Sequence, residues 1–134
     1  MHLAARSGAS AVVARLLEQG APVDARDAEG CTPLLWAAFA GQHEAAALLL
    51  KHRAEADAQD ETGQTSLHWA ARGHVSTVEL LLAYGAAPDA RDADGRTPAS
   101  WAEHEGRGDI LALFGEKAPD GTPSGSWAAG RRRE

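Results

Sequence analysis

Residues 60–71 gather side chains that an active site could use. They read Asp-Glu-Thr-Gly-Gln-Thr-Ser-Leu-His-Trp-Ala-Ala, so a carboxylate, hydroxyls and an imidazole lie close together along the chain. Such groups act as general bases, nucleophiles and metal ligands in enzymes. The serines of this chain, however, lack the strained turn that exposes a nucleophile. The six histidines include no His-x-x-x-His pair and no His/Cys cluster at ligand spacing.

The same phrase recurs at a fixed period. Residues 27–38 and 92–102 repeat it, and residues 2–5 match its end; the spacing is 33 residues from Thr32 to Thr65 and 32 from Thr65 to Thr97. An active site is a constellation made once, whereas scaffold residues recur. We therefore predict no catalytic residue, no cofactor, no metal site and no small-molecule substrate. A period of this length indicates stacked units that bury their apolar faces against each other.

Each unit carries the signals of two helices. Thr-Pro at 32–33 and 97–98, and Thr-Ser at 65–66, are helix starts, because the threonine hydroxyl caps free N–H groups and proline is tolerated at the first helical position. Glycine ends this short helix. The next helix has apolar residues four, five, eight and nine places after that glycine, which is one helical face. Gly20 and Gly85 suit its left-handed end; Arg53 at that place costs about 1 kcal/mol if it is left-handed.

The composition and net charge of the chain indicate which partners and which cellular location to expect. The chain has 134 residues, a net charge of −6 and one cysteine, Cys31. An intrachain disulfide is therefore impossible, and the acidic balance disfavours nucleic acid as a partner. The chain shows neither a signal peptide nor an apolar run long enough to cross a membrane. We expect an intracellular protein, in the cytoplasm or the nucleus.

The pattern D-x-x-G-x-T-P-L-H-x-A-A, followed by G-H, V-x-L-L-L and G-A, resembles ankyrin repeats. The resemblance implies an all-α solenoid of helix-turn-helix units with projecting β-turns. It covers a domain of residues 1–115, divided into repeats of about 2–26, 27–59, 60–91 and 92–115. The first repeat is truncated, the second has Leu35 in place of histidine, and the third lacks one residue between Ala71 and Gly73. The last has Ala99-Ser100 in place of Leu-His and is expected to cap the array.

The segment after the repeats has a different composition. Residues 116–134 are rich in Pro, Gly and Ser and lose the periodicity, so we predict disorder there. Trp127 beside the arginines at 131–133 could form a short docking or localisation motif. The alternative is a solvated tail without such a role.

The resemblance also implies roles for individual residues. Thr32, Thr65, Thr97 and His68 are expected to be structural, with the His68 ring tying one repeat to the next. Family members bind other proteins through the turn tips and the inner-helix surface. Trp36, Trp69 and Trp101 recur and should form a ladder, which either packs the repeats together or leaves ring edges for a partner. The remaining candidates are positions that vary between repeats: Arg6, Glu29, Phe39, Glu61, Gln64, Arg72, Asp94 and Arg96.

These observations favour a non-catalytic adaptor or scaffold that binds a protein partner and is itself a monomer. The alternative is a truncated isoform or fragment of a larger ankyrin-repeat protein, whose other parts carry the specific function. The sequence does not identify the partner.

Overall fold

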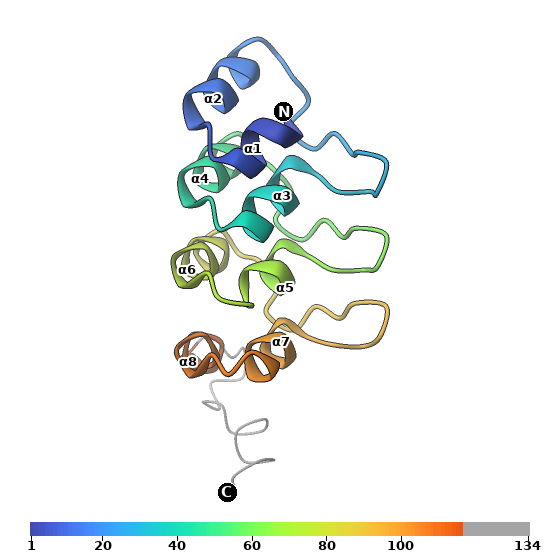
Figure 1. Cartoon of the computed structure of the whole chain (residues 1–134), viewed down its shortest axis with the longest axis vertical. Helices are drawn as coiled ribbons and strands as arrows, with labels where there is room; N and C mark the ends of the chain where they lie inside the picture. The colour runs from blue at the N-terminus through green and yellow to red at the C-terminus, as the bar shows by residue number, and fades with distance from the viewer. Residues whose placement is uncertain (117–134) are drawn as a thin grey trace, which may run out of the picture.

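The computed structural model describes residues 1–116, and these residues form eight α-helices (Figure 1). They are α1 (His2–Ser7), α2 (Ser10–Glu18), α3 (Pro33–Ala40), α4 (His43–Lys51), α5 (Ser66–Ala70), α6 (Val75–Ala83), α7 (Pro98–His104) and α8 (Gly108–Glu116). The described part contains no strand and no helix long and apolar enough to cross a membrane. The prediction of an all-α array is confirmed. The predicted disorder of 116–134 and the Trp127 motif fall on residues outside this part, apart from Glu116, which ends α8.

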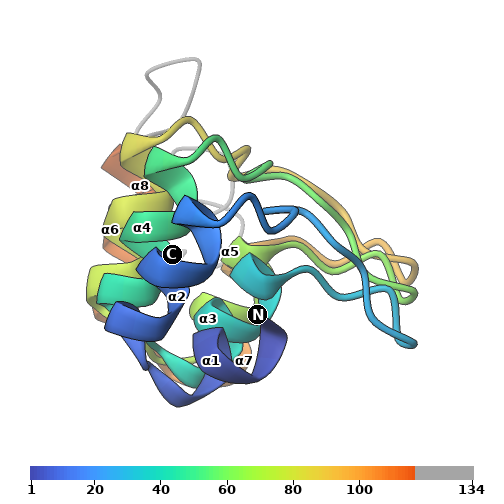
Figure 2. The same cartoon turned by 90° about the horizontal axis from the view of Figure 1, so that it is seen from above.

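The helices form two layers. The inner layer is α1, α3, α5 and α7, each packed on the next, and the outer layer is α2, α4, α6 and α8 (Figure 1). Three long loops, residues 19–32, 52–65 and 84–97, lead from an outer helix to the next inner helix. We call them the turn loops. They project together on one side of the stack, beyond the inner layer (Figure 2).

Three of the inner helices, α3, α5 and α7, begin at the predicted threonines, whereas α1 follows Met1. The Thr32 hydroxyl accepts a hydrogen bond from the Leu35 N–H at 3.2 Å, and Thr97 and Ser100 form a reciprocal capping box. In the third repeat α5 has only five residues against eight in α3. The missing residue between Ala71 and Gly73 removes only one position from this stretch, whereas α5 is three residues shorter than α3, because residues 71–73 form a turn.

Three of the outer helices, α2, α4 and α6, end in one recurring motif. After α2, the N–H of Ala21 bonds the Leu16 carbonyl and the N–H of Gly20 bonds the Leu17 carbonyl, both at 3.0 Å. This Schellman motif needs a left-handed residue at its turn. Gly20 and Gly85 have φ 86°, and Arg53 fills the same place with φ 70°, so Arg53 is left-handed.

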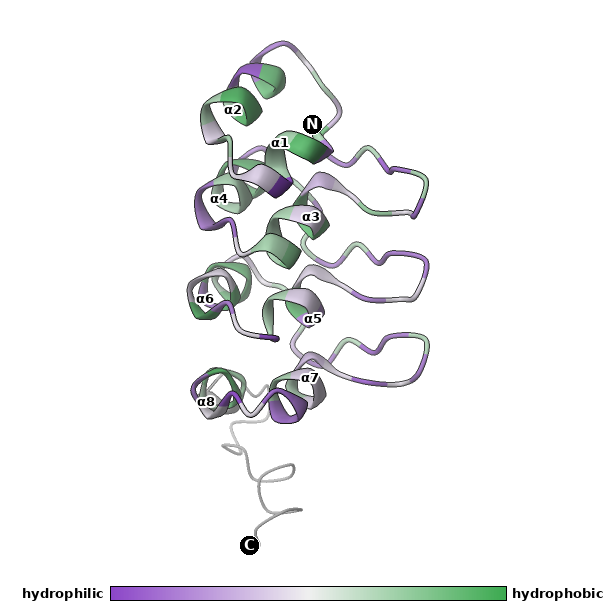
Figure 3. Ribbon diagram, viewed as in Figure 1, coloured by the Kyte–Doolittle hydropathy of each residue, from purple (hydrophilic) through white to green (hydrophobic). Residues whose placement is uncertain are grey.

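The core runs as a stripe between the two layers. Leu34, Leu49, Leu67 and Leu81 are fully buried, with alanines between them that let the helices approach closely. Apolar residues lie at the helix contacts and polar ones along the turn loops (Figure 3). In the first repeat, Val13 is buried whereas Val12 is 48 % exposed.

A ladder of side-chain hydrogen bonds joins the turn loops. Arg26 donates to the Gly30 carbonyl of its own loop and to the Gln59 carbonyl of the next loop. Gln59 repeats this with the carbonyls of Gly63 at 2.9 Å and Arg91 at 3.2 Å. The three loops are therefore held parallel, and the surface beside them has a fixed shape.

Candidate functional site

Aromatic rings line the surface where the inner helices meet the turn loops. Phe39, near the end of α3, packs edge-on against Trp36 with ring centroids 5.7 Å apart and against Trp69 with centroids 5.2 Å apart. The two tryptophans are half-buried, and Phe39 is 43 % exposed. Phe39 thus bridges two repeats and still presents much of its ring to solvent.

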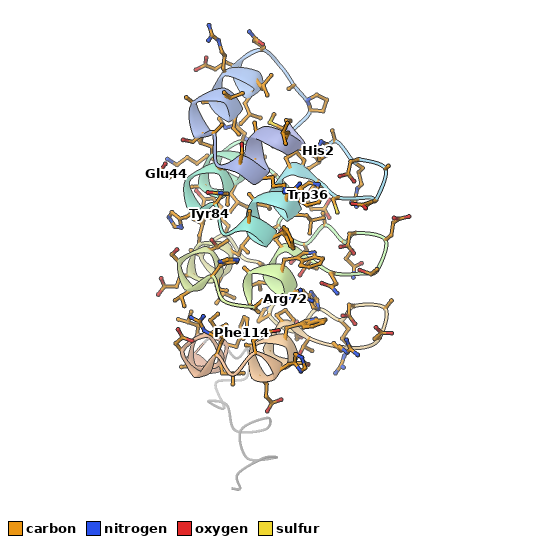
Figure 4. The ribbon with its side chains drawn as sticks, viewed as in Figure 1. His2, Trp36, Glu44, Arg72, Tyr84 and Phe114 are labelled. Carbon is orange, nitrogen blue, oxygen red and sulfur yellow. The ribbon has the colours of Figure 1, made fainter. Side chains whose placement is uncertain are left out.

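Arginines continue this row at both ends. The Arg72 guanidinium lies 4.8 Å from the Trp69 ring centroid and 4.2 Å from that of Trp101, and Arg6 lies 5.2 Å from the Trp36 ring. Arg72 follows the end of α5, and Figure 4 labels it beside that helix, on the side of α7. Such cation–π contacts stabilise each cation on a ring face. We call Arg6, Trp36, Phe39, Trp69, Arg72 and Trp101 the aromatic ladder.

The ladder is built by equivalent positions of successive repeats. Arg6, Phe39, Arg72 and His104 each occur near the end of an inner helix, and each contacts a tryptophan ring. Arg6 and Arg72 carry a permanent positive charge, and His104 is polar. Phe39 is the one apolar member, and it lies in the middle of the row.

Aspartates fix the indole rings from the turn loops. Trp36 Nε1 donates to Asp27 Oδ2 at 2.7 Å, and Trp69 Nε1 donates to Asp60 Oδ2 at 3.2 Å. The bond from Trp36 is the main cause that lowers the pKa of the Asp27 carboxyl. Trp101 Nε1 is buried without a hydrogen-bond partner among the described residues.

A groove of about 380 Å³ opens beside Phe39, between the second and third repeats. Its apolar walls come from Leu35 and the rings of Trp36, Phe39 and Trp69. Its other wall comes from two adjacent turn loops and consists of Glu29, Cys31, Asp60, Glu61, Thr62 and Gln64. We call this the central groove. Within residues 1–116, the Glu29 and Glu61 carboxylates form no ion pair and no hydrogen bond.

The turn loop of the second repeat brings three potential metal-binding groups together. Atoms of Asp27, Glu29 and Cys31 lie within 4.8 Å of one another. Asp27, however, already accepts bonds from the N–H groups of Glu29 and Cys31, both at 2.9 Å, and from Trp36. Burial, with the nearby carboxylates, raises the pKa of the Cys31 thiol to about 11, which keeps it protonated. Asp60 and Asp92 bond their own loops in the same way, so the arrangement is that of a turn.

His68, which was expected to be structural, and His2 both hold neighbouring repeats together. His68 is fully buried; its Nδ1 accepts from the Thr65 N–H at 3.0 Å, and its Nε2 lies 2.8 Å from the Arg96 carbonyl of the next repeat. His2 Nε2 lies 2.8 Å from the Ala25 carbonyl and 3.0 Å from that of Cys31. Both rings thus bond backbone groups that precede the next inner helix.

The structure brings most of the predicted binding residues onto one surface. The aromatic ladder contains six of them, the central groove adds Glu29, Glu61 and Gln64, and Arg96 lies 5.3 Å from the Trp101 ring. Asp94 lies apart from the groove, exposed on the last turn loop. Sequence reasoning missed the clamping role of Asp27 and Asp60. Their signal was the constant spacing of nine residues between each aspartate and its tryptophan.

Comparison with known proteins gives one family. A family model described as ankyrin repeats in three copies matches residues 1–92 and 55–123. No curated protein matches this chain.

Proposed function

Because the chain belongs to the ankyrin-repeat family, we propose that it is an intracellular adaptor that binds a protein partner through the aromatic ladder, the central groove and the turn-loop tips. Ankyrin repeats are generally non-catalytic protein–protein interaction modules. The proposal makes this chain a monomeric member that presents one rigid face and performs no reaction of its own.

The observation that supports this most is the position of Phe39. It exposes 43 % of its surface in the middle of the aromatic ladder, beside the central groove. Tryptophan and arginine dominate the energetics of protein interfaces, and the hot-spot residues cluster near the interface centre. Here tryptophans and arginines flank an exposed aromatic ring, as the centre of such an interface requires.

The rigidity of this face favours binding further. The loop ladder from Arg26 through Gln59 to Arg91 fixes the turn loops, and the indole bonds to Asp27 and Asp60 fix the rings. Side chains that are ordered before binding lose little conformational entropy on association.

The test compares capture of partners by three forms of the full chain. The first is the wild type, and the second carries Phe39→Ala with Arg72→Ala. The third is a matched control with Tyr84→Ala and Arg15→Ala, which removes an aromatic ring and an arginine from the outer-helix side. Tyr84 is 44 % exposed, almost the same as Phe39. Thermal melting must first show that all three are folded.

The proposal expects a partner that the wild type and the control bind alike. For the Phe39/Arg72 variant we expect its affinity to fall by at least about tenfold. A partner bound equally by all three folded forms would place the interface elsewhere and overturn the proposal.

A further inference from the structure

The aromatic ladder holds a cation in two places and lacks one in the middle. Arg6 lies on the Trp36 ring, and Arg72 lies between the rings of Trp69 and Trp101. Phe39 occupies the equivalent position between Trp36 and Trp69. The chain itself therefore shows which ligand these indole faces accept, and the central position provides no such ligand of its own.

The central groove adjoins this position and has the opposite charge. The carboxylates of Glu29, Asp60 and Glu61 line it, opposite the rings of Trp36, Phe39 and Trp69. Asp60 is engaged, because its two oxygens accept bonds from Thr62, Gln64 and Trp69. The Glu29 and Glu61 carboxylates have no partner within the described part of the chain.

None of the nearby arginines forms an ion pair with the carboxylates of this groove within the described residues. Arg72 and Arg6 lie on the indole rings, and Arg26 donates to two loop carbonyls. The amide oxygen of Gln64, which also lines the groove, is buried and has no hydrogen-bond partner within residues 1–116. The groove thus offers ring faces and unused acceptors together.

We propose that the central groove binds an arginine side chain of the partner protein. The guanidinium plane would lie against the exposed rings, and its N–H donors would bond the Glu29 and Glu61 carboxylates. A planar guanidinium suits this combination better than an ammonium does, because it stacks on aromatic rings, spreads its donors widely and is weakly hydrated. This inference rests on the proposed function, whose binding face it shares, and adds the chemistry of the partner.

The test titrates short peptides into the ¹⁵N-labelled full chain. Three acetylated and amidated Gly/Ser peptides differ only in a central residue: arginine, lysine or citrulline, which has the shape of arginine without the charge. The indole N–H resonances of Trp36, Trp69 and Trp101 report the site. We expect the arginine peptide to shift those of Trp36 and Trp69 and to bind about tenfold more tightly than the citrulline peptide. The lysine peptide should be intermediate.

Two variants and one control locate the site. Phe39→Arg supplies an internal guanidinium like those of Arg6 and Arg72, so the folded variant should bind the arginine peptide at least about tenfold more weakly. Glu29→Gln with Glu61→Gln removes the free carboxylates and should weaken it similarly. Glu18→Gln with Glu79→Gln changes the net charge equally on the exposed outer helices and should bind within about twofold of wild type.

The proposal is overturned by any of three results. These are no shift at Trp36 and Trp69 up to about 5 mM arginine peptide, equal or tighter binding of the citrulline or lysine peptide, or equal weakening by the outer-helix control. The proposed adaptor function has a separate readout. A partner lost only with Phe39→Ala and Arg72→Ala would uphold that function even if arginine peptides fail to bind. If arginine peptides bind but no such partner exists, the arginine site in the central groove is supported and the adaptor function is rejected.

Discussion

His68 accepts two hydrogen bonds from Thr65 on a single nitrogen. Its Nδ1 lies 3.0 Å from the Thr65 backbone nitrogen and 2.9 Å from the Thr65 hydroxyl. Because the backbone N–H can only donate, Nδ1 must be unprotonated. Nε2, at 2.8 Å from the Arg96 carbonyl, must then carry the proton. The ring can fill this site only as the neutral imidazole, and burial accordingly lowers the pKa of His68.

This requirement predicts a loss of stability in mild acid. The unfolded chain has a histidine pKa of about 6.5, and the folded value is lower, so the unfolded state binds more protons between the two values. The contribution of His68 is therefore complete above the unfolded pKa and declines as the pH falls toward the folded one. The second repeat has leucine, Leu35, at the position equivalent to His68. The substitution His68→Leu should therefore be accommodated and should lower the free energy of unfolding by about 1 kcal/mol at neutral pH.

The measurement is the free energy of unfolding in urea for both proteins across this range. The gap between wild type and His68→Leu should narrow as the pH falls from about 7.5 to about 5.5. Both proteins retain the other five histidines, so the difference isolates His68. A gap that stays constant or widens contradicts the neutral-ring assignment.

Arg53 predicts a stabilising substitution. It has φ 70° at a place where the first and third repeats have glycine, and it ends α4 with the same Schellman bonds. A side chain in this conformation is strained by about 1 kcal/mol relative to glycine. Arg53→Gly should therefore raise the free energy of unfolding by up to about 1 kcal/mol, measured in urea. The converse control is Gly85→Ala, because Gly85 has φ 86° and an added Cβ there meets nothing within 4 Å. This substitution should lower the free energy of unfolding by a similar amount.

The parts of the fold that follow local rules could be predicted from the sequence. The threonine starts, the glycine ends and the left-handed Arg53 each depend on a few neighbouring residues, and the repeat period showed how the units stack. These features need no knowledge of distances between repeats.

The contacts of the candidate site depend on distances that the sequence does not contain. The spacing placed the tryptophans in register, but not Phe39 in the gap between Trp36 and Trp69, nor Arg72 between two rings. The central groove likewise arises from two loops about 33 residues apart in sequence that lie side by side in space. The sequence does contain the constant Asp-to-Trp spacing of nine residues, but only the structure shows that it reflects hydrogen bonds from Trp36 to Asp27 and from Trp69 to Asp60.

The buried hydroxyl of Thr77 is expected to lower the free energy of unfolding. It lies in α6, is fully buried, and its Oγ1 has no hydrogen-bond partner in the described part of the chain. A buried polar group without a partner costs about 1–3 kcal/mol. Thr77→Val keeps the shape and removes that cost, so it should raise the free energy of unfolding by about 1 kcal/mol. In Thr32→Val the lost hydroxyl caps α3, and this control should instead lose about 1 kcal/mol. Equal effects of the two changes would contradict the assignment.

Substitutions at Gly63 and Gly95 measure how much the contact between turn loops contributes to the free energy of unfolding. They occupy the same place in successive loops, with φ 79° and 78°. A Cβ on Gly63 would lie 2.7 Å from the Ala93 backbone nitrogen, where Ala93 donates to Thr62 at 2.9 Å, whereas a Cβ on Gly95 meets nothing within 4 Å. Gly95→Ala should lower the free energy of unfolding by about 1 kcal/mol, because only the strain of alanine in the left-handed conformation is added. Gly63→Ala should lose at least about 1 kcal/mol more, because the rigid backbone of the next loop must move. Urea unfolding of both variants gives the difference directly, and equal losses would mean that the loops separate freely and that the wall of the central groove is not fixed.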